Sequence, residues 1–165
     1  MASNNKITFL VVLVLVAGAV TLFGQAPKKS VISYPVGYRK WAHVKSMVIF
    51  GKDHKLFNQF EGLHNVYVND IGWPSLQQGR VYPDGSMLAF ELFALKSSPG
   101  AIESGPRKFL AVMRKNSKLY ADTGGWGFEV FQGYQSEGSL KDMKQCFNCH
   151  ASKKAKDFVF SDFAQ

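Results

Sequence analysis

The sequence predicts an α+β fold, in which a mainly antiparallel β-sheet is accompanied by a few short helices and a C-terminal helix. Short stretches of alternating apolar residues recur along the chain, and turns containing Gly, Pro and Ser separate them. These stretches follow one another without long amphipathic helices between them, which is typical of antiparallel sheets. The last of them is followed by a segment with helical character.

The first half of the domain contains two predicted strands and one short helix. Apolar side chains alternate along residues 42–50, and residues 63–69 are rich in Val and Tyr, so both segments are expected to be strands. Residues 69–79 predict a turn and a short helix, with Pro74 near the first helical position and Gly79 past the end.

The second half contains a predicted hairpin, further strands and the C-terminal helix. The turn sequence Pro83-Asp84-Gly85-Ser86 is expected to join two strands. Residues 96–106 are rich in Ser, Gly and Pro and predict a loop. The remaining expected elements are hairpin strands at 81–82 and 87–95, strands at 108–113 and 126–131, and a helix at about 140–154.

The most informative motif is Cys146-Phe147-Asn148-Cys149-His150, which has the C-x-x-C-H spacing of a covalent haem attachment site. Positions i, i+3 and i+4 of a helix share one face, so Cys146, Cys149 and His150 point the same way. Two thiols can bond to haem vinyl groups while the imidazole ligates the iron. We therefore expect one covalent haem c, with His150 as the metal ligand. The alternatives are a thioredoxin-like redox pair, half of a zinc site, or a small structural disulfide.

An apolar run at residues 7–23 precedes the domain and indicates export. The run is long for the core of a signal peptide and short for a membrane span, and Pro27 disfavours cleavage after Ala26. Residues 1–26 are therefore expected to be a signal peptide or an uncleaved N-terminal membrane anchor, and residues 27–165 a haem domain. Because covalent haem attachment takes place on the exported side of a membrane, we expect a periplasmic location, soluble or anchored.

The chain is basic, with 20 Lys and Arg against 12 Asp and Glu and a formal charge of +8. A basic surface is either simply solvated or binds anionic partners or membrane headgroups. The lysines are scattered rather than clustered, which argues against nucleic acid as a partner.

Six further stretches, together with the haem motif, resemble the cytochrome P-460 family, which includes the cytochromes c′-beta. They occur in the family's order over nearly the whole domain: YPVGYRKW at 34–41, HNVYVN at 64–69, PDGS at 83–86, RKNSK at 114–118, TGGWGF at 123–128 and DFVFS at 157–161. The resemblance implies a β-rich homodimer with one haem per chain, His150 as the proximal ligand, and an open distal side.

The family's enzymes oxidise hydroxylamine at a haem that is cross-linked to a lysine. The resemblance places that lysine in the predicted strand at 63–69, which contains none. Whether the chain is an enzyme therefore stays open, and the c′-beta members, which bind nitric oxide and carbon monoxide at a five-coordinate haem, are the better match. The expected function is binding, with or without oxidation, of small nitrogen species such as nitric oxide or hydroxylamine.

The alternative function is that of a simple periplasmic electron-transfer cytochrome c with a filled sixth position. His43, His54, His64 or a methionine would then supply the sixth ligand. In either case the redox partner protein is not identified by the sequence.

Arg39 and Glu91 match residues that line the distal pocket in the family's enzymes, and are the candidate catalytic residues. Glu91 lies in a predicted strand whose two faces are both apolar, with Ala89 and Phe93 on its own face. A desolvated carboxylate there would favour its protonated form and could take protons from hydroxylamine. The alternative for Glu91 is a structural Glu–Arg pair. For Arg39 the two possibilities are a structural ion pair and contact with a ligand or a haem propionate.

Overall fold

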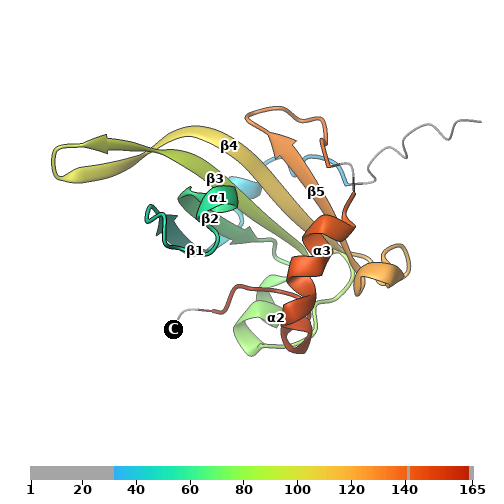
Figure 1. Cartoon of the computed structure of the whole chain (residues 1–165). Coiled ribbons are helices and arrows are strands. Elements are labelled where there is room, and N and C mark those ends of the chain that lie inside the picture. The colour runs from blue at the N-terminus through green and yellow to red at the C-terminus, as the bar shows by residue number, and fades with distance from the viewer. Residues whose placement is uncertain (1–31, 141, 164–165) are drawn as a thin grey trace, which may run out of the picture.

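The computed structural model describes residues 32–140 and 142–163, so the predicted leader at 1–26 lies outside the described residues. One five-stranded antiparallel sheet forms the body of the domain, and its strands are neighbours in chain order (Figure 1). The α+β prediction is therefore confirmed. The strands are β1 (Ala42–Ile49), β2 (Gly62–Val68), β3 (Met87–Ser98), β4 (Ala101–Lys115) and β5 (Trp126–Gln132).

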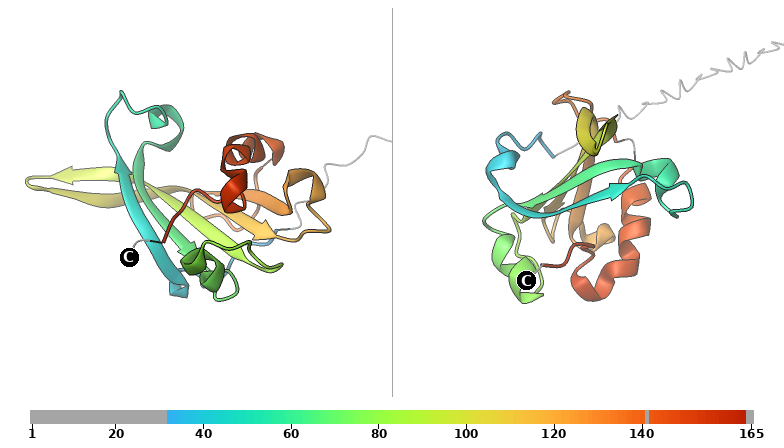
Figure 2. Two further views of the ribbon diagram at one scale, coloured as in Figure 1. Left: turned by 90° about the horizontal axis from the view of Figure 1, so that it is seen from below. Right: turned by 90° about the vertical axis from the view of Figure 1, so that its left-hand side faces the viewer.

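Short helices lie on both sides of the sheet. Figure 2 shows α1 and α3 on one side and the 3₁₀ turn η1 on the other. The short helix expected at residues 69–79 is present as α2, which Gly79 ends in the left-handed conformation at φ 61°. The helical elements are η1 (Tyr38–Lys40), α1 (Phe57–Phe60), α2 (Trp73–Gln78), η2 (Ala121–Thr123), α3 (Lys144–His150) and η3 (Ala151–Lys156).

The prediction of a loop at residues 96–106 is wrong, because these residues extend β3 and β4 into a long hairpin (Figure 1). Its tip is Pro99-Gly100, with Gly100 at φ 73°, which only glycine adopts at low cost. The pairing shifts register around Phe93, and this irregularity accommodates Pro106 within β4. The turn residues that predicted a loop thus form the tip and the bulge of a ribbon.

Two other expected elements differ in extent. Residues 81–82 are not a strand, and β3 pairs with β4 instead. The C-terminal helix begins at Lys144 rather than at 140, and η3 continues it to Lys156. The side chain of Asp142 accepts a hydrogen bond from the Lys144 N–H at 2.9 Å, which satisfies an end group of the helix.

The sheet buries a separate cluster of side chains on each face, named here the α3 face and the η1 face. Alternation along β3 shows the division, because Leu88 belongs to the α3 face and Ala89 to the η1 face. The buried cluster of the α3 face comprises Val44, Val66, Val68, Leu76, Tyr82, Leu88, Met113, Trp126, Phe128 and Val159. That of the η1 face comprises Ile32, Tyr38, Ala89, Leu110, Val112, Tyr120 and Phe131.

Asp157 fixes the segment that follows η3 to the sheet. Both of its carboxylate oxygens accept hydrogen bonds from Lys115 Nζ, at 2.7 and 2.9 Å, and one also accepts the Tyr82 N–H at 2.9 Å. The Trp126 indole donates to the Asp157 carbonyl at 2.8 Å. Asp157 and Phe158 both adopt positive φ, of 48° and 65°, so these contacts hold a tight turn in place.

In the described part of the chain, no helix has the length and apolar character needed to cross a membrane. The apolar run at 7–23 lies outside that part.

Candidate haem site

The haem-attachment motif lies on α3, as the spacing predicts. The thiols of Cys146 and Cys149 are both unpaired, the first half-buried and the second exposed. Cys146 and Phe147 pack against the buried cluster of the α3 face, and this contact fixes the rotation of the helix. Burial raises the pKa of the Cys146 thiol, so it is protonated at neutral pH. The structure thus presents two free thiols beside a histidine on one short helix.

The imidazole ring of His150 is oriented by a single main-chain contact. Its Nδ1 lies 2.7 Å from the Phe158 carbonyl oxygen. Because a carbonyl oxygen can only accept, Nδ1 carries the proton and Nε2 holds the free lone pair. Burial lowers the pKa of the imidazole, which keeps it in the neutral state that ligates metals. Phe128 and Phe160 pack on the ring at centroid distances of 5.1 and 4.9 Å.

An aromatic surface lies on the same face of the sheet as α3. Phe60, Phe90 and Phe109 contact one another with ring centroids 5.7 to 6.3 Å apart, and all three are half-buried. Phe90 also packs against the buried cluster that contains Phe128. A flat apolar group can cover such a surface without leaving polar atoms unsatisfied. The two thiols, the oriented His150 and this aromatic surface together fit a haem c.

His64 is the polar residue within this aromatic surface. It is 2% exposed, its ring lies 5.0 Å from that of Phe90, and its Nε2 donates to the Phe60 carbonyl oxygen at 2.5 Å. The sequence had identified His64 only as one of several possible sixth ligands. Its place in the strand was the stronger signal. His64 is separated by two residues from Val66 and by four from Val68, so all three side chains point to the same face of the sheet.

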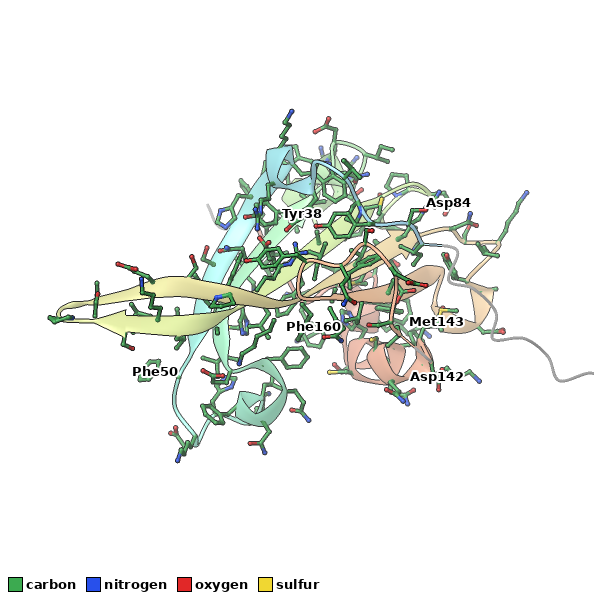
Figure 3. The ribbon with its side chains drawn as sticks, turned by 90° about the horizontal axis from the view of Figure 1, so that it is seen from above. Tyr38, Phe50, Asp84, Asp142, Met143 and Phe160 are labelled. Carbon is green, nitrogen blue, oxygen red and sulfur yellow. The ribbon has the colours of Figure 1, made fainter. Side chains whose placement is uncertain are left out.

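Arg39 and Glu91 lie together, but on the η1 face. Glu91 is 1% exposed and contacts Arg39 Nη2 at 2.5 Å, and Tyr38 Oη donates a short hydrogen bond to it. His150 packs on the α3 face, so the sheet separates it from this pair. Figure 3 labels Tyr38, which bonds to Glu91, and Phe160, which packs on His150. These contacts are those of the alternative, a Glu–Arg ion pair, and a distal-pocket role for Arg39 and Glu91 stays a prediction.

Arg107, which the sequence did not single out, completes the group on the η1 face. Its guanidinium donates to the Gly133 carbonyl oxygen at 2.5 Å, to Tyr34 Oη at 3.0 Å and to Tyr38 Oη at 2.8 Å, and it lies 3.4 Å from Glu91. Burial, followed by the bond to Glu91, raises the pKa of Tyr38, so this hydroxyl remains a donor. The group joins the segment before β1 to the middle of the sheet.

We expect Glu91→Gln to lower the free energy of unfolding by about 3 kcal/mol, because the variant leaves Arg107 buried without a counter-charge. Denaturant unfolding measures this loss. Glu103→Gln is the matched control, since Glu103 pairs with Lys96 at an exposed site on the hairpin. Covalent haem content and carbon monoxide binding should match the wild type. If the variant had normal stability but no longer bound carbon monoxide, Glu91 would belong to the ligand site and not to a structural ion pair.

A comparison with protein families supports the same reading of the site. The model of the family described as Cytochrome P460 matches residues 35–161, which run from the segment before η1 to the turn beyond Asp157 and include the whole motif on α3. No curated protein matches the chain at a significant level. The match covers most of the sequence, and the chain therefore belongs to the cytochrome P460 family and is a haem c cytochrome.

Proposed function

We propose that the protein is an exported cytochrome with one covalent haem, whose iron is held by His150 and is open on its other side to small nitrogen species. The observation that carries the proposal is the hydrogen bond from His150 Nδ1 to the Phe158 carbonyl, since it leaves Nε2 as the only ring atom free to ligate. Cys146 and Cys149 would form the two thioether bonds. The haem supplies a redox-active iron, and the chain supplies its ligand, its apolar surroundings and its exclusion of water.

The placement of His43 and His54 supports an open site rather than an electron carrier with a filled sixth position. His43 is exposed and contacts Ser46 Oγ at 3.0 Å. His54 is also exposed, and its Nδ1 accepts the Leu56 N–H at 3.3 Å. Neither lies among the aromatic residues of the α3 face. Nitric oxide and hydroxylamine are the ligands that we propose for this site.

The proposal favours ligand binding over the cross-linked chemistry of the family's enzymes. Strand β2, where the resemblance places the cross-linking lysine, reads Gly-Leu-His-Asn-Val-Tyr-Val and contains no lysine. The bonds of Glu91 to Tyr38 and Arg39, on the other face of the sheet from His150, also support ligand binding without this carboxylate as a general base. We further propose a periplasmic homodimer, soluble or anchored through residues 1–26, that exchanges electrons with a partner protein.

We expect the ferrous protein to be high-spin and to bind carbon monoxide without displacing a protein ligand, because no side chain has to leave an open site. Absorption spectra recorded anaerobically, with and without carbon monoxide, measure this. The spectrum should lack the red-shifted band of a lysine cross-link, and the intact mass should equal that of the chain with one haem. A low-spin ferrous spectrum that carbon monoxide leaves unchanged would contradict the proposal and favour the electron carrier.

A further inference from the structure

His64 has a buried ring nitrogen that nothing in the described part of the chain satisfies. The side chain is 2% exposed, and its Nδ1 has no hydrogen-bond partner among residues 32–140 and 142–163. Buried polar atoms in folded proteins are nearly always paired, so an unpaired one requires a physical explanation. Its surroundings are the rings of Phe60 and Phe90, at centroid distances of 6.5 and 5.0 Å.

The protonation of the His64 ring follows from its one hydrogen bond. Nε2 lies 2.5 Å from the Phe60 carbonyl oxygen, which can only accept, so Nε2 carries a proton. Burial lowers the pKa of His64, which keeps the ring neutral. Nδ1 is therefore a bare lone pair, able to accept a hydrogen bond and unable to donate one.

The direction of the side chain places the His64 ring on the side of the sheet that carries α3. His64 shares its face of β2 with Val66 and Val68, both of which belong to the buried cluster beneath Cys146 and Phe147. The neighbouring half-buried side chains, Phe60 and Phe90, are hydrocarbon. Nδ1 is thus an acceptor inside an otherwise apolar surface.

We propose that His64 Nδ1 is the hydrogen-bond acceptor of the ligand pocket, and that it selects ligands that bring their own N–H or O–H. Hydroxylamine brings both kinds of donor, whereas carbon monoxide and nitric oxide bring neither. The selection arises because only a donor-bearing ligand satisfies the unpaired nitrogen, and in an apolar site such a hydrogen bond is strong. This inference rests on the proposed haem site and adds the class of ligand that it prefers.

The test compares one ligand of each kind in the holoprotein. His64→Leu removes the acceptor and keeps an apolar side chain. The dissociation constant of hydroxylamine from the ferric protein, measured by anaerobic optical titration, should rise about tenfold, the usual effect of one hydrogen bond. The dissociation constant of carbon monoxide from the ferrous protein should change less than about twofold, because that ligand has nothing to donate.

His64→Gln is the rescue variant, because its amide N–H can still donate to the Phe60 carbonyl while its amide oxygen accepts from the ligand. It should restore most of the hydroxylamine affinity. His43→Leu, at an exposed position on β1, is the control and should alter neither dissociation constant. If His64→Leu does not fold, His64→Phe removes the same acceptor within aromatic surroundings.

Three results would overturn the assignment of His64. Unchanged hydroxylamine affinity in the leucine variant would show that Nδ1 does not meet the ligand. Equal weakening of both ligands would show a steric or structural role. A low-spin ferrous spectrum that disappears in the variant would make His64 an iron ligand. The proposed function itself fails differently, since the wild-type protein would then bind neither ligand at its haem.

Discussion

Replacement of both Cys146 and Cys149 by serine is expected to abolish covalent haem attachment completely. The two thiols are the only cysteines of the chain, and both lie unpaired on α3 beside His150. Serine hydroxyls do not add to haem vinyl groups, so nothing would replace the thioether bonds. The intact mass of the purified variant should fall to that of the polypeptide, and the Soret band should be lost under denaturing conditions.

Each single variant provides an intermediate case. Cys146→Ser and Cys149→Ser should each retain one thioether, with a pyridine haemochrome band shifted toward that of a haem with one free vinyl group. Asn148→Ser is the matched control, because Asn148 is exposed on the same helix between the two thiols and should keep full haem content. Covalent haem in the double variant would contradict the assignment of the motif.

The second large effect is expected at Asp157, where Asp157→Asn should lower the free energy of unfolding by about 3 kcal/mol or more. Lys115 and Asp157 are 7% and 8% exposed, so the variant leaves the lysine ammonium buried without its counter-charge. Asparagine tolerates the positive φ of 48° and can still accept the Tyr82 N–H, so the loss reports the charge rather than the backbone. Denaturant unfolding measures the change.

The exposed pair of Lys156 and Asp162 is the control for Asp157. Its nitrogen and oxygen are 2.6 Å apart, but both side chains are more than half exposed, so Asp162→Asn should cost less than about 1 kcal/mol. The Asp157 variant should also broaden the Soret band, because Phe158, whose carbonyl orients His150, is the next residue. An equal, small effect of both substitutions would show that the buried pair does not hold the turn.

The sequence predicted the sheet because alternation is a local property. The strands at 42–50, 63–69 and 126–131 were found because each shows apolar residues at period two with aromatic or β-branched side chains. The ribbon at 96–106 was missed because its residues are those of turns, and no local pattern distinguishes a loop from a hairpin stabilised by its continuation into a sheet.

The sequence predicts the geometry of the candidate site best where the residues are close in sequence. Spacing alone placed Cys146, Cys149 and His150 on one helix, as the structure has them on α3, whereas the positions of Arg39 and Glu91 depend on which face of the sheet carries α3. Both faces of β3 are apolar, since each is covered by a different segment, so parity could not assign Glu91 to a face. His64 was undervalued for a related reason, because burial of one ring nitrogen is a tertiary property.

The acceptor that orients His150 is a main-chain carbonyl, and this has a consequence for the electronics and the evolution of the iron site. A neutral carbonyl draws the Nδ1 proton less strongly than a carboxylate would, so His150 as an iron ligand would donate only moderately to the metal and would not drive the reduction potential far downward. Any amino acid at position 158 that tolerates the positive φ of 65° supplies the same carbonyl, whatever its side chain. The orientation of His150 therefore depends on the path of the main chain, which the contacts of Asp157 determine one residue earlier.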